Sequence, residues 1–449
     1  MLSFDDTDKT EYSKHSLQEI MDWIESIKST TRVSLEKIKL NDCTPWYYDE
    51  NRGEIRNPNG SFFQIKGIKM SGEKETVYQP IIIQNEIGFL GIIACKIQGV
   101  WHYLMQAKIE PGNVNVVQVS PTIQATKSNF EARHGGRIPD YLDFFLGMKP
   151  ESILVDQIQS EQSSRFYGKR NRNVIIVSDT ELEEKKNFRW LTLSQIKALM
   201  HYDNLVNMDT RTVISCIPFV LLEDEKDLPF AQNQVYKSSV TELNRQTIVS
   251  LYNVMNNYKM FNENRVSLLP LHELKGWDIR DNGVFPDHDY SFEVIYCKVL
   301  IEGREVTSWN QPLIASRGIG TIGLICCNFD GMMKFLVRPR AEIGCRDLIE
   351  IGPTIQQDYA GREDDEVIRL FWDKLEKNEG VLIDTLLSEE GGRFYQEQNR
   401  NVIIEISKDE IGELPNGYVW SDYGTLNIMM QINNVLNIQL RNMLSFLEI

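Results

Sequence analysis

Pro121-Thr-Ile-Gln124 recurs as Pro353-Thr-Ile-Gln356, 232 positions later, and this repetition indicates how the chain is organised. The same shift, without a gap, places Gln79-Pro80, Gly88-x-x-Gly91 and Glu110-x-Gly112 on Gln311-Pro312, Gly320-x-x-Gly323 and Glu342-x-Gly344. A shift of 228 matches Ser160-Glu161…Arg165-Phe-Tyr167…Asn171-Arg-Asn173 with Ser388-Glu389…Arg393-Phe-Tyr395…Asn399-Arg-Asn401. A period above 200 residues is typical of a duplicated domain and not of a solenoid.

The repeat predicts two domains within the 449 residues. The first repeat covers residues 1–220, an acidic linker covers 221–235, and the second repeat covers 236–449. Each repeat has a length that can bury its own core. The composition, with 42% hydrophobic and 25% charged residues, is that of a soluble globular protein.

Charge and cysteine usage narrow the class of protein. The net charge of -16 and the pI near 5.0 oppose binding to a nucleic-acid backbone, which requires a basic surface. Seven scattered cysteines without a C-x-x-C pair indicate reduced thiols. The polar N-terminus is no signal peptide, and no apolar run is long enough to span a bilayer. We therefore expect a cytoplasmic protein without membrane contact.

Local patterns predict an α+β fold in two copies related by a pseudo-twofold axis. Residues 16–27 and 240–260 have helical periodicity, and β-type runs follow in each half. Gln98-Gly99 and Asp330-Gly331 separate apolar runs and predict tight hairpins. We expect one antiparallel sheet in each half. The apolar stripe from Leu426 to Leu447 predicts a helix at the C-terminal end.

The recurring polar residues admit two interpretations. Thr or Gln after Pro often closes a turn, and a single Arg often pairs with a carboxylate. A whole set kept in one register instead favours a shared concave site, where Arg binds phosphate and an aromatic face packs on a base or sugar.

The segment from Leu104 through Pro121-Thr-Ile-Gln124 to Phe130, with His134-Gly-Gly136, resembles the signature of the NDP-hexose 2,3-dehydratases. The resemblance covers nearly the whole chain, including the duplication. It implies a Nudix-like fold in each half, a homodimer, and action on dTDP-4-keto-6-deoxyglucose in deoxysugar biosynthesis. The product is an unstable 3,4-diketo sugar, so a 3-ketoreductase or another enzyme is expected to consume it.

Such an elimination requires only acid–base groups. The C4 carbonyl acidifies the hydrogen on C3, a base removes it, donors stabilise the enolate, and an acid protonates the departing C2 hydroxyl. No cofactor is implied, and the common nucleotide-loop and zinc motifs are absent from the sequence. Two other functions stay open: a non-catalytic sugar-nucleotide-binding protein, and a Nudix-type pyrophosphohydrolase, although the Nudix metal-binding pattern cannot be placed.

Four residues are candidates for catalysis. Lys108 and Glu110 lie two apart on a predicted strand and so share a face, as a base and an electrostatic stabiliser or as a simple salt bridge. His134 could titrate near neutrality in its Gly-rich loop, or be a surface histidine. Tyr395 could donate to an oxyanion, or be a core aromatic. The spacing does not decide which half reacts.

The binding candidates fall into two pockets, one in each half, with Trp46 and Trp277 as corresponding wall residues. Arg338 and Arg340 lie on one strand face and are the candidates for a pyrophosphate clamp. The remaining candidates are Thr122, Gln124, Thr126, Lys127, Ser128, Ser160 and Arg165 from the first half, and Thr354, Gln356, Arg393, Phe394 and Tyr395 from the second.

Overall fold

The computed structural model describes residues 12–58, 60, 62–72, 76–126, 138–218, 235, 238, 245–302, 306–361 and 363–447. Helices and strands are mixed within each half, so the predicted α+β class is confirmed. Almost all of the linker expected at 221–235 lies outside these residues. No helix in the described ranges is long and apolar enough to cross a membrane.

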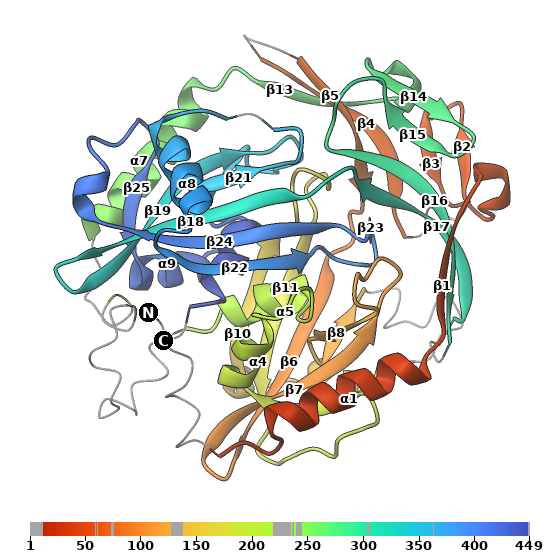
Figure 1. Ribbon diagram of the computed structural model, residues 1–449. Helices are drawn as coiled ribbons and strands as arrows, with labels where there is room; N and C mark the ends of the chain where they lie inside the picture. The colour runs from red at the N-terminus through yellow and green to blue at the C-terminus, as the bar shows by residue number, and fades with distance from the viewer. Residues whose placement is uncertain are drawn as a thin grey trace.

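A seven-stranded sheet forms the larger part of each half, with the same strand order in both (Figure 1). The first comprises β6 (Gly88–Ile97), β7 (Val100–Ile109), β8 (Val117–Ser120), β9 (Ile123–Ala125), β10 (Ile153–Ser160), β11 (Arg170–Val177) and β12 (Phe188–Thr192). The second comprises β18 (Gly320–Phe329), β19 (Met332–Ala341), β20 (Ile349–Gly352), β21 (Ile355–Gln357), β22 (Val381–Ser388), β24 (Gln398–Ile406) and β25 (Val419–Asp422).

The expectation of a purely antiparallel sheet is wrong at one strand pair of the large sheet in each half. Strand β11 runs parallel to β6, and β24 runs parallel to β18. Long connections precede both strands, and a crossover of that length permits parallel pairing where a short hairpin does not. The predicted hairpins at Gln98-Gly99 and Asp330-Gly331 are confirmed: all four residues have positive φ, as a tight two-residue turn requires.

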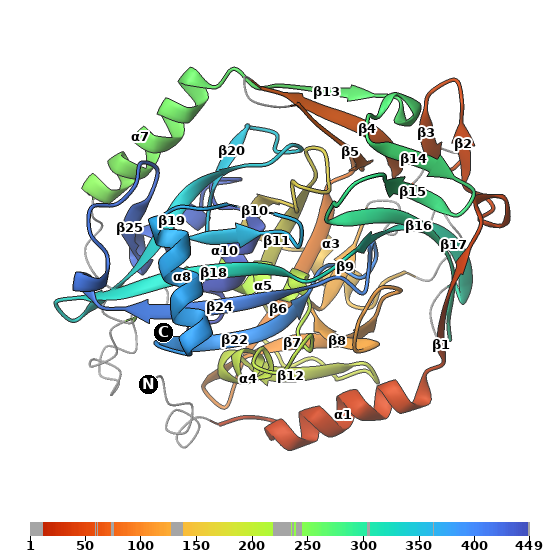
Figure 2. The ribbon, with the colours of Figure 1, turned by 45° about the horizontal axis from the view of Figure 1, so that its top comes forward.

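A smaller second sheet in each half includes one strand from the other half. The first contains β2 (Tyr47–Asp49), β3 (Glu54–Arg56), β4 (Gln64–Ser71), β5 (Thr76–Ile83) and the incoming β13 (Arg265–Leu269). The second contains β14 (Trp277–Arg280), β15 (Gly283–Pro286), β16 (Phe292–Ile301), β17 (Ser308–Ser316), β23 (Phe394–Tyr395) and the incoming β1 (Val33–Ile38). Figure 2 shows β13 beside β4 and β1 beside β16. The halves therefore exchange strands.

Helices cover the sheets and join the halves. They are α1 (Leu17–Thr30), α3 (Leu142–Leu146), α4 (Leu193–Leu199), α5 (Met208–Ser215), α7 (Arg245–Phe261), α8 (Glu366–Lys377), α9 (Tyr423–Met430) and α10 (Ile438–Leu444). Short 3-10 turns occur at η1 (Leu40–Asp42), η2 (Pro150–Ser152), η5 (Leu271–Glu273) and η6 (Lys408–Glu410). Helices α5 and α10, one from each half, pack against each other.

The single C-terminal helix predicted from the apolar stripe is instead two helices. Asn434 adopts a left-handed φ of 57° between them, and Asn437 begins α10 by accepting a hydrogen bond from the Leu440 amide. The apolar spacing continues across both short helices because they bury their apolar residues in the same core. Hydrophobic spacing alone therefore missed a helix start that Asn437 specifies.

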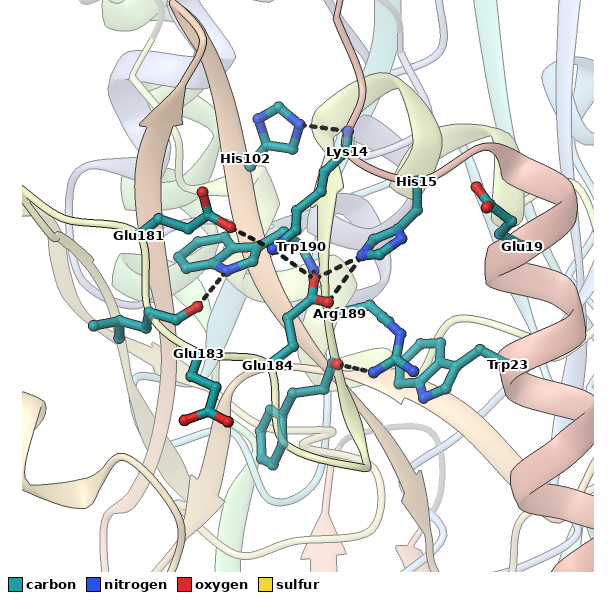
Figure 3. A network of polar contacts seen from close by, with 12 residues as sticks. Lys14, His15, Glu19, Trp23, His102, Glu181, Glu183, Glu184, Arg189 and Trp190 are labelled. Carbon is teal, nitrogen blue, oxygen red and sulfur yellow. Dashed lines mark hydrogen bonds and ion pairs between the residues drawn. The ribbon is translucent and has the colours of Figure 1, made fainter.

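A cluster of polar side chains links the segment before α1, at Lys14 and His15, to the connection between β11 and β12, at Glu181 and Glu184 (Figure 3). The Glu184 carboxylate lies 2.7 Å from His15 Nε2 and accepts a hydrogen bond from the Trp190 amide at 2.8 Å. Lys14 forms an ion pair with Glu181, and its backbone amide donates to His102 Nε2. These contacts position α1 so that its apolar face covers the core.

Candidate active site

Lys108 and Glu110 lie at the C-terminal end of β7, at the centre of a chain of polar contacts. The Lys108 Nζ atom is 3.3 Å from Glu110 Oε1. Gln124 donates its amide to the same carboxylate oxygen at 3.1 Å, and Asn207 donates to Gln124 Oε1 at 3.2 Å. Asn207 also caps α5 by accepting from the Thr210 amide. The Glu110 carboxylate is thus held by one cation and by a relay that ends at a helix cap.

The other half completes this site. The Gly112 amide donates to the Gly391 carbonyl at 2.7 Å, which brings residues 390–393 against the end of β7. A side chain at Gly391 would meet Asn113 Oδ1 at 2.2 Å and Glu110 Cβ at 3.1 Å, so glycine permits this approach. Glu390 is partly exposed there. We call the group Lys108, Glu110, Gln124, Asn207, Asp209, Glu390 and Arg393 the first site.

Two further carboxyl groups in the first site have perturbed pKa values. Burial, followed by repulsion from Glu110, raises the pKa of Glu390 to about 7, although Arg393 opposes this shift. Burial and the charges of Glu161, Glu390 and Glu110 raise the pKa of Asp209 well above its ordinary value. The Asp209 Oδ1 atom is buried without a hydrogen-bond partner in the described part of the chain. A carboxyl group that stays protonated near neutrality can serve as a general acid.

The second half contains the matching arrangement, which we call the second site. Gln356 donates to Glu342 Oε1 at 3.0 Å, and Asn437 donates to Gln356 Oε1 at 2.8 Å. Arg340 occupies the position that matches Lys108. The residues that match Asp209 and Glu390 are the neutral side chains Gln439 and Gln162. The relay is therefore duplicated, whereas carboxyl groups at the positions of Asp209 and Glu390 occur in the first site alone. In the second site, burial raises the pKa of Glu342 itself to about 7.

The two arginines expected to clamp a pyrophosphate both contact a carboxylate of the protein. Arg340 Nη1 lies 2.7 Å from Glu363 Oε1, and Arg338 Nη2 lies 3.0 Å from Glu363 Oε2. Burial and the neighbouring Arg338 lower the pKa of Arg340. A phosphate group would have to displace the Glu363 carboxylate before it could bind both guanidinium groups.

The other arginine candidates lie where the halves meet. Arg165, which is buried, reaches across to Asp358 at 3.1 Å and stacks over the Phe292 ring. Arg393 stacks over Phe63 and donates to Gln84. Arg165 of the first half thus contacts residues of the second half, and Arg393 of the second half contacts residues of the first half.

Several candidates serve the fold in this structure. Thr122 and Thr354 are buried and bond to backbone atoms between strands, and the Ser160 hydroxyl donates to Glu350 Oε2 at 2.7 Å. Trp46 and Trp277 are buried in an aromatic core, and each indole N–H donates to a carbonyl of the opposite half. Phe394 is buried in the same core.

The remaining candidates are placed as follows. Tyr395 is partly exposed with Lys37 over its ring, and Thr126 is partly exposed just after β9. Lys127, Ser128 and His134 lie outside the described residues.

Sequence reasoning brought Lys108, Glu110 and Gln124 into one site but missed Asn207, Asp209 and Glu390. It assigned Arg393 to the pocket of the second half, whereas the structure places Arg393 beside Glu390 and Glu110 in the first site. A signal was available. Asn207-Met-Asp209 matches Asn437-Ile-Gln439, and Ser388-Glu389-Glu390 matches Ser160-Glu161-Gln162. Comparing the two copies for positions where a carboxylate replaces an amide would have identified the acidic pair.

A fixed carboxylate beside a cation, together with carboxyl groups of raised pKa, is typical of enzymes that act by acid–base catalysis. In the described ranges no three His, Cys, Asp or Glu side chains are grouped so that they could hold a metal ion. The family model described as NDP-hexose 2,3-dehydratase matches residues 17–217 and again residues 249–447. The chain belongs to this family.

Three curated relatives carry the name dTDP-4-dehydro-6-deoxy-alpha-D-glucopyranose 2,3-dehydratase. The protein from Saccharopolyspora spinosa is 37% identical over 95% of this chain and 90% of its own length. The protein from Streptomyces violaceoruber is 34% identical over 94% and 95% of the two chains. The protein from Amycolatopsis orientalis is 32% identical over 95% and 89%. Both halves are thus included in each match.

Proposed function

We propose that this protein eliminates water across C2 and C3 of dTDP-4-keto-6-deoxyglucose and that the reaction takes place at the first site. Family membership and the names of the relatives support the substrate. The observation that carries the assignment to the first site is the presence of Asp209 and Glu390 where the second site has Gln439 and Gln162.

The geometry suggests a role for each group. Glu110, held by Lys108 and Gln124, removes the proton on C3, and the Lys108 ammonium stabilises negative charge that develops on the C4 oxygen. Glu390 donates its proton to the departing C2 hydroxyl, which leaves as water. Because Asp209 is buried, we assign it no proton transfer to the substrate; burial and the nearby charges of Glu161, Glu390 and Glu110 raise its own pKa.

Loss of water in this way gives an enol that tautomerises to the 3,4-diketo-2,6-dideoxy sugar. The reaction is that of a carbon–oxygen lyase. Proton transfers by this chain's side chains account for each of its steps. A 3-ketoreductase or a similar enzyme that consumes the unstable product is part of the proposal.

The proposal also includes properties that the family resemblance implies. These are descent of each half from a Nudix-like domain, assembly as a homodimer, and a cytoplasmic location. The shared strand order of the two large sheets supports duplication of one ancestral domain.

The test is incubation of the purified protein with dTDP-4-keto-6-deoxyglucose, with and without a chelator, followed by mass spectrometry. We expect loss of one water in both samples. Release of dTMP would instead identify a pyrophosphohydrolase, and an unchanged substrate would identify a binding protein.

Site variants then test the assignment to one half. Glu110→Gln should abolish dehydration, whereas Glu342→Gln, the matched change in the second site, should retain it. Equal losses in the two variants would contradict a reacting centre in the first half alone.

A further inference from the structure

A hollow apart from the first site lies between the halves and is lined by cations that the proposed reaction does not use. Its volume is about 340 Å³, within the range of small-ligand pockets. The first half contributes Ser163, Lys169 and Arg170, and the second contributes Arg346, Glu350 and Asn434. The amide of Gly168 donates to the Gly344 carbonyl at 2.8 Å, which fixes the two walls relative to each other.

Two of the three cations of this hollow, Arg170 and Arg346, are not paired by the protein, whereas Lys169 donates to the Glu86 carbonyl and lies near the charge of Glu161. Arg170 and Arg346 form no ion pair with a carboxylate in the part of the chain that the structure describes. Burial and the proximity of Arg346 lower the pKa of Arg170, so the two guanidinium groups repel each other. Many other cations of this acidic chain are paired.

The two carboxyl groups beside the arginines do not offset their charge. Asp347 is bound by Lys259. Glu350 accepts a hydrogen bond from Ser160, and its burial raises its pKa to about 8, so it is largely protonated at neutral pH. An unbalanced pair of guanidinium groups therefore faces the hollow.

The duplicated half provides an internal comparison. The matching clasp is present there, because the Gln396 amide donates to the Gly112 carbonyl at 2.9 Å. The residues that match Lys169, Arg170 and Arg346 are Glu397, Gln398 and Val114. The same backbone arrangement thus forms without any of the three cations, and folding does not account for their presence.

We propose that the hollow between Lys169, Arg170 and Arg346 binds a diphosphate group. Two guanidinium groups from different elements suit a diphosphate, since each can donate two parallel hydrogen bonds to phosphate oxygens. Lys169 borders the hollow with an ammonium group of lowered pKa near 8, which a bound anion would keep protonated. The diphosphate belongs either to the nucleotide of the reacting sugar or to a separate ligand.

The experiment is calorimetric titration of the whole protein with inorganic pyrophosphate. Arg170→Gln with Arg346→Val replaces both arginines by the residues that the copy has at these two positions, and affinity should fall by about tenfold or more. Arg172→Gln is the matched control, because Arg172 lies on the same strand but is bound by Asp156 at 2.6 Å. It should change the affinity by less than about twofold.

Two further arms complete the test. Arg170→Lys with Arg346→Lys keeps the positive charge and should retain part of the affinity for pyrophosphate. This variant distinguishes weaker anion binding from misfolding as the cause of a lower affinity. If dTDP displaces pyrophosphate, the hollow holds the nucleotide's own diphosphate, whereas simultaneous binding identifies a separate ligand. Absence of saturable binding by the wild type, or equal affinity in the Gln/Val variant, overturns the proposal. Since binding requires no turnover, failure of the proposed reaction would leave this result unaffected.

Discussion

Replacement of Glu390 by glutamine is expected to lower kcat for dehydration by about 10²–10⁴ and, at the same time, to stabilise the folded protein at alkaline pH. The pKa of Glu390 is about 7 in the folded protein against an ordinary value of 4.5. The folded state therefore holds this proton more tightly than the unfolded state. The stabilising contribution is complete below pH 4.5 and is lost as the pH rises through about 7.

The size of both effects follows from this shift and from the proposed role. Above pH 7 the ionised carboxylate costs up to about 3 kcal/mol, which glutamine avoids because it cannot ionise. Loss of a general acid lowers kcat by about 10²–10⁴, equivalent to roughly 2.7–5.4 kcal/mol of activation free energy. In the wild type, kcat should decline above about pH 7 as Glu390 loses its proton.

The assays are a pH profile of kcat by mass spectrometry and urea unfolding at pH 5 and at pH 8.5. The variant should gain stability relative to the wild type only at the higher pH. Gln162→Glu, the reverse change at the matching position of the second site, should leave kcat unchanged. Turnover within tenfold of the wild type, or a loss of stability at pH 8.5, would refute the role of Glu390.

Three further variants test the relay and the packing. Asn207→Ala removes the α5 cap and the hydrogen bond to Gln124, so the free energy of unfolding should fall by about 1 kcal/mol and kcat by about tenfold or more. The matched variant Asn437→Ala should lose similar stability but retain kcat. Urea unfolding and steady-state kinetics measure the two effects. Gly112→Ala places a Cβ 1.5 Å from the Phe394 carbonyl and should prevent soluble expression, whereas Gly412→Ala meets nothing within 4 Å and should express normally. Glu184→Ala leaves the Trp190 amide without its acceptor and should lower stability by about 1–3 kcal/mol in thermal unfolding. The control Glu181→Ala, at an exposed position, should lower stability by less than about 1 kcal/mol.

Part of the candidate site could be predicted because it depends on local geometry. Lys108 and Glu110 are two residues apart, so strand periodicity alone places them on one face, and the structure has them 3.3 Å apart. Gln124 followed from its exact recurrence at Gln356. Asp209 and Glu390 could not be placed in this way, since Asp209 lies in the first turn of a helix and Glu390 lies in a turn of the opposite half.

The sequence by itself determined the duplication, the α+β class, the hairpins and the family, because these depend on repetition, periodicity and turn residues that are read locally along the chain. Only the tertiary structure decided that β1 and β13 cross to the opposite halves and that residues 390–393 close on the end of β7. It also decided which carboxyl groups have a raised pKa. Strand exchange and burial bring together residues that are hundreds of positions apart, and a pKa depends on those neighbours.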